Sequence, residues 1–251
     1  MKYVKILHEG IEKWGVLEED YIRTLSEPPY ERIVFDGNKL QYGGAKLLAP
    51  CDAGKVVCVG KNYREHALEL GGSVPDYPIL FIKPSTSIIA HDEDIVYHPW
   101  LTRVDYEAEL AFVIKKRAWR VPPEEAAGYI LGYTCLNDVT AREIQRQDVQ
   151  WTRAKSLDTF CPIGPIVTDE CDPDSLEVMA LLNGEIRQRA NTSAFITDTA
   201  HMLSFITQGI TLLPGDVVAT GTPAGIGPMR PGDIIEIVIP GVGTLRNRVT
   251  G

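Results

Sequence analysis

Residues 105–114 of the chain read Asp-Tyr-Glu-Ala-Glu-Leu-Ala-Phe-Val-Ile. Side chains alternate between the two faces of a strand, so Glu107 and Glu109 are expected on one face, and the residues after them make the strand apolar on both faces. The two acids would then lie at the mouth of a core strand. Two like charges about 5–7 Å apart repel in such a place unless a cation or a proton neutralises them. The simpler alternative is a solvated edge strand that carries Asp105, Glu107 and Glu109.

A third acid, Asp138, stands where an apolar segment ends and a predicted helix begins. An aspartate at this place can simply cap the helix. Together with Glu107 and Glu109, however, it completes a set of three carboxylates. Oxygen ligands of this kind suit Mg²⁺ or Mn²⁺, so the sequence indicates a metal site.

Two further features could supply catalytic groups. His66 and Glu69 share one face of a helix predicted over residues 62–70 and closed by Gly71-Gly72, and a carboxylate beside an imidazole makes a general base. A surface ion pair is the alternative. Lys155 could stabilise an enolate or a carboxylate. Residues 221–227, Gly-Thr-Pro-Ala-Gly-Ile-Gly, offer backbone N–H groups to a carboxylate, or form only a tight turn.

Composition limits the class of protein. The chain has 251 residues, of which 44% are hydrophobic and 24% charged, and this is typical of a folded globular protein. The net charge of −9 disfavours nucleic acid as a partner. We find no apolar stretch that could span a membrane and no signal peptide, so we expect a cytoplasmic protein. The five scattered cysteines indicate neither disulfides nor a thiolate zinc site.

The pattern of strands and turns divides the chain into residues 1–52, a small β-rich N-terminal module, and residues 53–251, the main domain. Short strands are predicted near residues 4–7, 14–17 and 22–25. In the main domain strands outnumber helices and do not alternate with them, which predicts a mostly β (α+β) fold with mixed sheets and a few short helices. The helices are expected at residues 141–147, from Glu124, and at 201–206, where Asp198 or Thr199 is the cap and Gly209 the end.

Six motifs, in order, resemble the fumarylacetoacetate hydrolase family. They are Val-Gly-Lys-Asn-Tyr-x-x-His at 59–66, Phe-Ile-Lys-Pro-Ser-Thr-Ser at 81–87, Asp-Tyr-Glu-Ala-Glu-Leu at 105–110, Asn-Asp-Val-Thr-Ala-Arg at 137–142, Ala-Lys-Ser-Leu-Asp at 154–158, and Pro-Gly-Asp at 214–216 followed by the glycine-rich residues 221–227. The resemblance covers residues from about 56 to the C-terminus. It implies a mixed β-roll or β-sandwich.

The resemblance also implies roles for individual residues. Glu107, Glu109 and Asp138 would bind Mg²⁺ or Mn²⁺, which would chelate a 2-oxo acid substrate and stabilise its enolate. His66 and Glu69 would lie on a lid helix and move a proton, and Lys155 would stabilise the developing enolate. Residues expected to hold the substrate are Gln145, Thr222, Arg142 and Lys83. The family further implies a homodimer.

The chain lacks the long N-terminal domain of the eukaryotic fumarylacetoacetases, so it is similar to the smaller branch of acylpyruvases, 2-hydroxyhepta-2,4-diene-1,7-dioate isomerases and decarboxylases. We expect C–C bond hydrolysis of an acylpyruvate or fumarylpyruvate. The alternative is an isomerase, tautomerase or decarboxylase, of 2-hydroxyhepta-2,4-diene-1,7-dioate or oxaloacetate type, in the breakdown of aromatic acids. A non-catalytic module that binds a 2-oxo acid or a metal is the alternative of another class; the base dyad argues against it.

Overall fold

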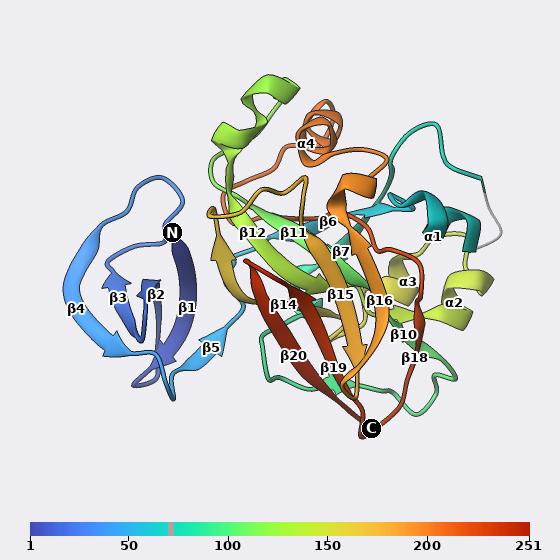
Figure 1. Cartoon of the computed structure of the whole chain (residues 1–251), viewed down its shortest axis with the longest axis horizontal. Coiled ribbons are helices and arrows are strands. Elements are labelled where there is room, and N and C mark those ends of the chain that lie inside the picture. Colours follow the sequence, from blue (N-terminus) through green and yellow to red (C-terminus); the bar gives the residue numbers. More distant parts are fainter. Residues whose placement is uncertain (70–72) are drawn as a thin grey trace.

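The computed structural model describes residues 1–69 and 73–251, and it confirms the predicted mostly β fold with a few short helices (Figure 1). The strands of these residues form three sheets. The largest runs in the order β4 (Phe35–Gln41), β3 (Tyr21–Leu25), β2 (Ile11–Glu18), β1 (Lys2–His8), β14 (Cys161–Thr168), β12 (Ile130–Asn137), β11 (Ala108–Ile114), β17 (Val217–Ala219), β6 (Lys55–Gly60) and β7 (Ile79–Pro84). Two short strands, β5 (Lys46–Leu48) and β8 (Ile88–Ile89), pair with β1 and β14.

A second sheet covers part of the first and has the order β16 (Glu185–Asn191), β15 (Glu177–Leu182), β19 (Ile234–Ile239), β20 (Gly243–Thr250) and β9 (Ile95–Val96). A small third sheet contains β13 (Thr140–Ala141), β10 (Val104–Tyr106) and β18 (Gly227–Met229). Most neighbours are antiparallel, but β17 and β6 are parallel. The expectation of mixed sheets is therefore confirmed.

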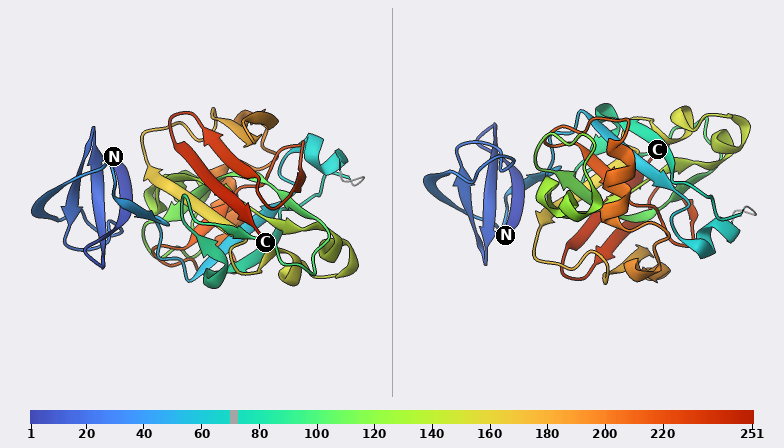
Figure 2. Two further views of the ribbon diagram at one scale, coloured as in Figure 1. Left: turned by 90° about the horizontal axis from the view of Figure 1, so that it is seen from below. Right: turned by 90° about the horizontal axis from the view of Figure 1, so that it is seen from above.

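The first three strands lie where the sequence predicts them and belong to a lobe at one end of the molecule (Figures 1 and 2). The lobe is joined to the rest through the large sheet, because β1 pairs with β14 and places Tyr3 opposite Val167. Buried Trp14 and Tyr30 belong to the same apolar cluster as Val56 on β6. The division of the chain between residues 52 and 53 stays a prediction.

The described helices are short, and none is long and apolar enough to cross a membrane. As expected, Asp198 caps α4 (Thr199–Thr207) by accepting a hydrogen bond from the His201 N–H. The helix expected near Glu124 is the 3₁₀ segment η2 (Pro123–Tyr129). The helix predicted over residues 62–70 is α1 (Arg64–Glu69). Its predicted end at residues 70–72 lies outside the described residues. The remaining helices are α2 (Arg142–Gln147), α3 (Thr152–Lys155), η1 (Ser85–Ser87) and η3 (Thr192–Ala194).

Glu107 and Glu109 face the same cavity, as expected, but the acidic strand is interrupted between them. The chain changes sheet at Glu107, which lies in a break between β10 and β11, so simple strand alternation does not relate Glu107 to Glu109. The break arises because the Glu107 N–H donates to the side-chain oxygen of Asn137 (3.0 Å), while the Glu107 carbonyl accepts from the Asp138 N–H (2.9 Å). Every residue of β11 is buried, as predicted for a core strand.

Candidate functional site

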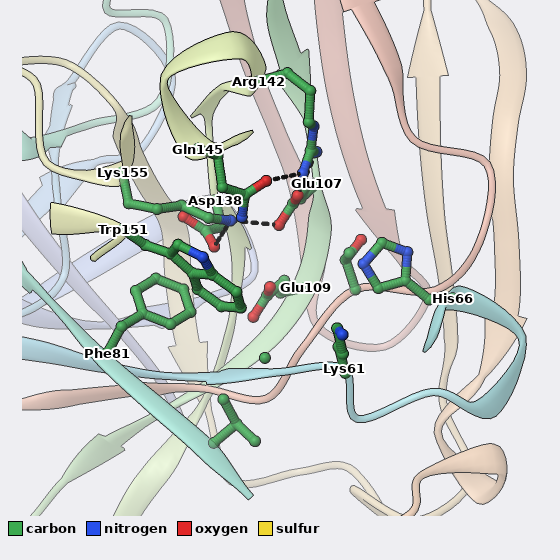
Figure 3. Close-up of a pocket in the computed structure, with 13 residues that line it drawn as sticks. Lys61, His66, Phe81, Glu107, Glu109, Asp138, Arg142, Gln145, Trp151 and Lys155 are labelled. Atoms are coloured by element: carbon green, nitrogen blue, oxygen red, sulfur yellow. Dashed lines mark hydrogen bonds and ion pairs between the residues drawn. The ribbon is translucent and has the colours of Figure 1, made fainter. Parts of the chain in front are cut away.

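The three predicted metal ligands meet at one buried place (Figure 3). Glu107, Glu109 and Asp138 each offer a carboxylate oxygen, and these oxygens all lie within 4.8 Å of one another. The adjacent strands β11 and β12 bring them together, since Glu107 and Glu109 flank the start of β11 and Asp138 follows β12. The alternative of a solvated edge strand is wrong, because Asp105 is fully buried as well.

Two of the three carboxylates are paired with buried cations. Glu107 accepts from Arg142 Nη2 (2.5 Å) and Lys155 Nζ (2.7 Å), and Asp138 accepts from Lys155 Nζ (2.5 Å) and Lys83 Nζ (2.6 Å). Burial alone would raise the pKa of Glu107, but Lys155 and Arg142 outweigh it and hold that pKa well below its usual range. Glu107 is therefore ionised.

Glu109 differs from its two neighbours. In the described part of the chain it forms no ion pair, and its Oε2 accepts one hydrogen bond, from the Gly221 N–H (2.7 Å). Burial, and then the charges of Asp138 and Glu107, raise the pKa of Glu109 well above its usual value. Within the described residues, no cationic side chain pairs with Glu109, and an all-oxygen donor set of this charge fits Mg²⁺ or Mn²⁺.

The carboxylates line a cavity that also contains most of the other predicted site residues. His66, Arg142, Gln145, Lys155 and Thr222 line it; further lining residues are Val59, Gly60, Lys61, Phe81 and Trp151. The predicted groups, which lie up to 156 residues apart in the sequence, are thus assembled around one space (Figure 3).

The predicted pairing of His66 with Glu69, the candidate general base, is present in the structure. His66 is buried, and its Nδ1 lies 3.1 Å from Glu69 Oε2. The other oxygen of Glu69 accepts from the Gly225 N–H (3.0 Å). The glycine-rich segment thereby contacts a carboxylate, as its backbone N–H groups suggested, although this carboxylate belongs to the protein.

The four predicted substrate-binding residues divide into two groups. Gln145 and Thr222 line the cavity next to Arg142. Gln145 Oε1 accepts from Arg142 Nη1 (2.6 Å). Lys83 does not line the cavity: it is fully buried, and its ammonium donates to Asp138 and to the Val139 carbonyl (3.3 Å). This placement argues against a contact with substrate, because Lys83 lies behind Asp138 and holds that carboxylate instead.

Sequence reasoning did not assign several residues that support the site. Asp105 accepts from Arg142 Nε (2.9 Å) and Arg103 Nε (2.8 Å), and so orients the guanidinium that binds Glu107. Its place in the Asp105–Leu110 motif was a usable signal. Gln188 donates to Thr222 Oγ1 (2.8 Å) from the otherwise largely exposed strand β16, where nothing in the local sequence marks it.

An aromatic wall closes one side of the cavity. Trp151 and Phe81 pack edge to face with ring centroids 5.4 Å apart, and the Lys155 ammonium lies 5.1 Å from the Phe81 ring centroid. Gly60 permits this arrangement, since a Cβ there would lie 2.9 Å from the Trp151 ring. The wall keeps water from one side of the charged groups, which strengthens their interactions.

Comparison with known proteins identifies relatives of almost the whole chain. The family model of the fumarylacetoacetate (FAA) hydrolase C-terminal domain matches residues 55–250, and a second model, Rv2993c-like N-terminal, matches residues 1–50. Over 219 residues the chain is 38% identical to the oxaloacetate tautomerase YisK of Bacillus subtilis, covering 81% of this chain and 73% of that protein. It is 44% identical over 190 residues to the mitochondrial oxaloacetate tautomerase fahd-1 of Caenorhabditis elegans. This match covers 73% of this chain and 89% of that protein.

A solved structure is similar over the whole chain. The 2-hydroxyhepta-2,4-diene-1,7-dioate isomerase from Mycobacterium marinum superposes with a TM-score of 0.93 at 39% identity, and the match covers 100% of this chain and 98% of that one. The likeness includes the N-terminal lobe as well as the main body.

Proposed function

The chain belongs to the fumarylacetoacetate hydrolase family, and from this premise we propose that it is an isomerase or tautomerase of a 2-oxo dicarboxylic acid. It would interconvert the keto form of the acid and its enol by moving one proton between carbon and oxygen. Of the activities that the sequence left open, the names of the relatives, two oxaloacetate tautomerases and an isomerase, favour this one over hydrolysis. The proposal therefore replaces C–C hydrolysis, our first expectation, with its alternative.

One observation carries the proposal: a buried histidine, held by the carboxylate of Glu69 behind it, lines the same cavity as a cluster of three carboxylates. A keto–enol conversion needs a base that removes a proton from carbon and an electron-withdrawing group at the neighbouring carbonyl. The cavity offers both within one enclosed space. A module that only binds would need no base held in this way.

We assign the metal site to Glu107, Glu109 and Asp138, with Mg²⁺ or Mn²⁺ as the cation. When bound, the cation would withdraw electrons from the 2-oxo group and make the adjacent C–H more acidic. The second lone pairs of the carboxylate oxygens remain available beside Lys155, so the existing ion pairs do not exclude a metal.

The side chains of the chain itself perform the proton transfer. His66 Nε2 would remove the proton from carbon, because Nδ1 is occupied by Glu69, and the Glu69 carboxylate would stabilise the imidazolium that forms. Lys155 would stabilise the negative charge on the enolate oxygen. Arg142, Gln145 and Thr222 would orient the substrate, and the Trp151–Phe81 wall would exclude water that could quench the enolate.

The decisive experiment follows the conversion of enol to keto oxaloacetate by the decay of enol absorbance, with metal-free protein and with Mg²⁺ added. We expect acceleration that requires Mg²⁺, with no change in product mass. A product that gains water would instead identify a C–C hydrolase, and loss of CO₂ a decarboxylase. Binding of oxaloacetate without any acceleration would identify a non-catalytic module.

A further inference from the structure

Three cationic side chains line the cavity, and they differ in their partners. Arg142 is bound to Asp105 and Glu107, and Lys155 is bound to Glu107 and Asp138. Lys61 also lines the cavity, but within residues 1–69 and 73–251 it forms no hydrogen bond through its side chain and no ion pair. It is therefore the lining cation whose charge is available to an anionic ligand.

The backbone of Lys61 adopts an unusual conformation. Its φ is +58°, in the left-handed region that glycine enters freely and that is unfavourable for lysine. The turn is secured by the next residue, because the Asn62 amide donates to the carbonyls of Thr197 (3.0 Å) and Thr220 (2.8 Å) and accepts from the Thr197 N–H (2.9 Å). The turn itself thus gains nothing from a lysine side chain at position 61.

Lys61 lies apart from the other two cations that line the cavity. In Figure 3 it lies at the end of the cavity opposite Arg142 and Lys155, with Glu109 between them, and near His66. A 2-oxo acid whose carboxylate and oxo group lie at the metal ligands would extend its other end across the cavity. An ammonium at that end can donate up to three hydrogen bonds to a second carboxylate.

We propose that Lys61 is a specificity-determining residue that binds the second, distal carboxylate of the substrate. The inference rests on the proposed function, because it takes the 2-oxo acid group to lie at Glu107, Glu109 and Asp138. In this role Lys61 would select dicarboxylates over 2-oxo acids that end in an uncharged group. A bound distal carboxylate would also offset the left-handed backbone, since the strained residue gains an ion pair only in the complex.

The test compares two ligands that differ only in the distal group, 2-oxoglutarate and 2-oxopentanoate, by calorimetric titration of the full chain in Mg²⁺. A charge-assisted hydrogen bond predicts that wild type binds 2-oxoglutarate roughly 10- to 100-fold more tightly. In Lys61→Met, whose side chain is unbranched like that of lysine and one atom shorter, this preference should fall to within about threefold. Lys61→Arg should keep most of it. Lys116→Met, outside the cavity, should keep all of it.

The proposal is overturned if wild type shows no preference, or if Lys61→Met keeps the wild-type preference. It is also overturned if Lys61→Arg loses as much as Lys61→Met, since charge would then not be the cause. The ligand preference and the enol–keto acceleration test the two proposals independently. A Lys61-dependent preference without enol–keto acceleration would refute the proposed reaction alone, whereas acceleration with a preference independent of Lys61 would refute this inference alone.

Discussion

At the scale of single residues, the buried carboxylates decide what the site can bind. Among the described residues, cationic side chains pair with Glu107 and Asp138, but none pairs with Glu109. The cost of keeping Glu109 ionised next to two other acids is removed either by a proton or by a metal ion. Binding of the proposed metal at this site would therefore be coupled to the protonation of Glu109.

This coupling predicts the behaviour of Glu109→Gln. The amide keeps the shape and can accept from the Gly221 N–H, but it carries no charge and is a weaker metal ligand. We expect the metal-free variant to melt at or above the wild-type Tm, and to lose the Mg²⁺-induced rise of roughly 5–10 °C that saturating metal should give wild type. Scanning calorimetry with and without Mg²⁺ measures both. Glu125→Gln, on the exposed segment η2, is the control, and a full Mg²⁺ response in Glu109→Gln would exclude Glu109 as a ligand.

The pH dependence follows from the same residue. The raised pKa of Glu109 means that the folded, metal-free protein holds this proton more tightly than the unfolded chain. The stabilisation by this group is complete below the unfolded carboxyl pKa and is lost as pH rises through the raised one. A metal replaces the proton, so the Mg²⁺-induced rise in Tm should increase as the pH rises from the ordinary carboxyl pKa towards the raised pKa of Glu109. A constant rise over this range would show that Glu109 does not release a proton to the metal.

His66→Asn tests the base without touching the metal ligands. Asparagine can still hydrogen-bond to Glu69 but can neither deliver a proton to carbon nor remove one from it, so we expect kcat for enol–keto conversion to fall by about 10²- to 10⁴-fold. The Mg²⁺-induced rise in Tm should stay. His201→Asn is a matched control, because His201 pairs with Asp198 at the same i, i+3 spacing on the exposed surface. Equal kcat in His66→Asn and wild type would remove His66 from the mechanism.

At the scale of elements, the turn at residues 221–227 connects one of the proposed metal ligands to the carboxylate of the proposed base pair His66–Glu69. Gly221 donates to Glu109 and Gly225 donates to Glu69. Both glycines have positive φ, and Gly221 also approaches the chain around Asn62 closely. The sequence predicted a cradle for a ligand carboxylate here, whereas the two donors found bind carboxylates of the protein.

Two glycine-to-alanine variants distinguish the stability cost of the close contact at Gly221 from the cost of its positive φ. A Cβ on Gly221 would lie 2.8 Å from Asn62 Cβ and 2.9 Å from the Val59 carbonyl, whereas Gly232 has a similar φ and open space around it. We expect Gly232→Ala to cost about 1–2 kcal/mol of unfolding free energy and Gly221→Ala about 3–5 kcal/mol. Urea denaturation measures both, and equal costs would show that the close approach to Asn62 is unimportant.

At the scale of the whole molecule, the N-terminal lobe and the main body share a sheet and an apolar core. Strand β1 extends the large sheet at β14, and Trp14, Tyr30 and Val56 belong to one cluster. A shared core makes separate unfolding of the lobe unfavourable, because it would expose apolar surface on both sides. We therefore expect a single calorimetric transition for the full chain.

Trp14→Ala tests this cooperativity. The buried indole packs against Tyr30, with ring centroids 5.7 Å apart, and its removal should cost about 3–5 kcal/mol and lower the common Tm by roughly 10 °C. Trp100→Ala, on a side chain that is 55% exposed, should change the Tm little. Two transitions, with only the lower one moved by Trp14→Ala, would show that the lobe unfolds independently.

The sequence by itself determined the mostly β fold, the three acids and the His66–Glu69 pair, because each depends on local information: apolar patterning, short spacings and motif order. It also gave Asp198 as one of two candidate helix caps, and the structure shows that Asp198 is the cap. Only the tertiary structure decided that the chain changes sheet at Glu107, that Lys83 lies behind Asp138, and that Asp105 and Gln188 support the site. These features depend on which partner each buried polar group finds across long stretches of chain. Such pairing is decided when β10, β11, β12 and β16 are packed together, and no local pattern encodes it.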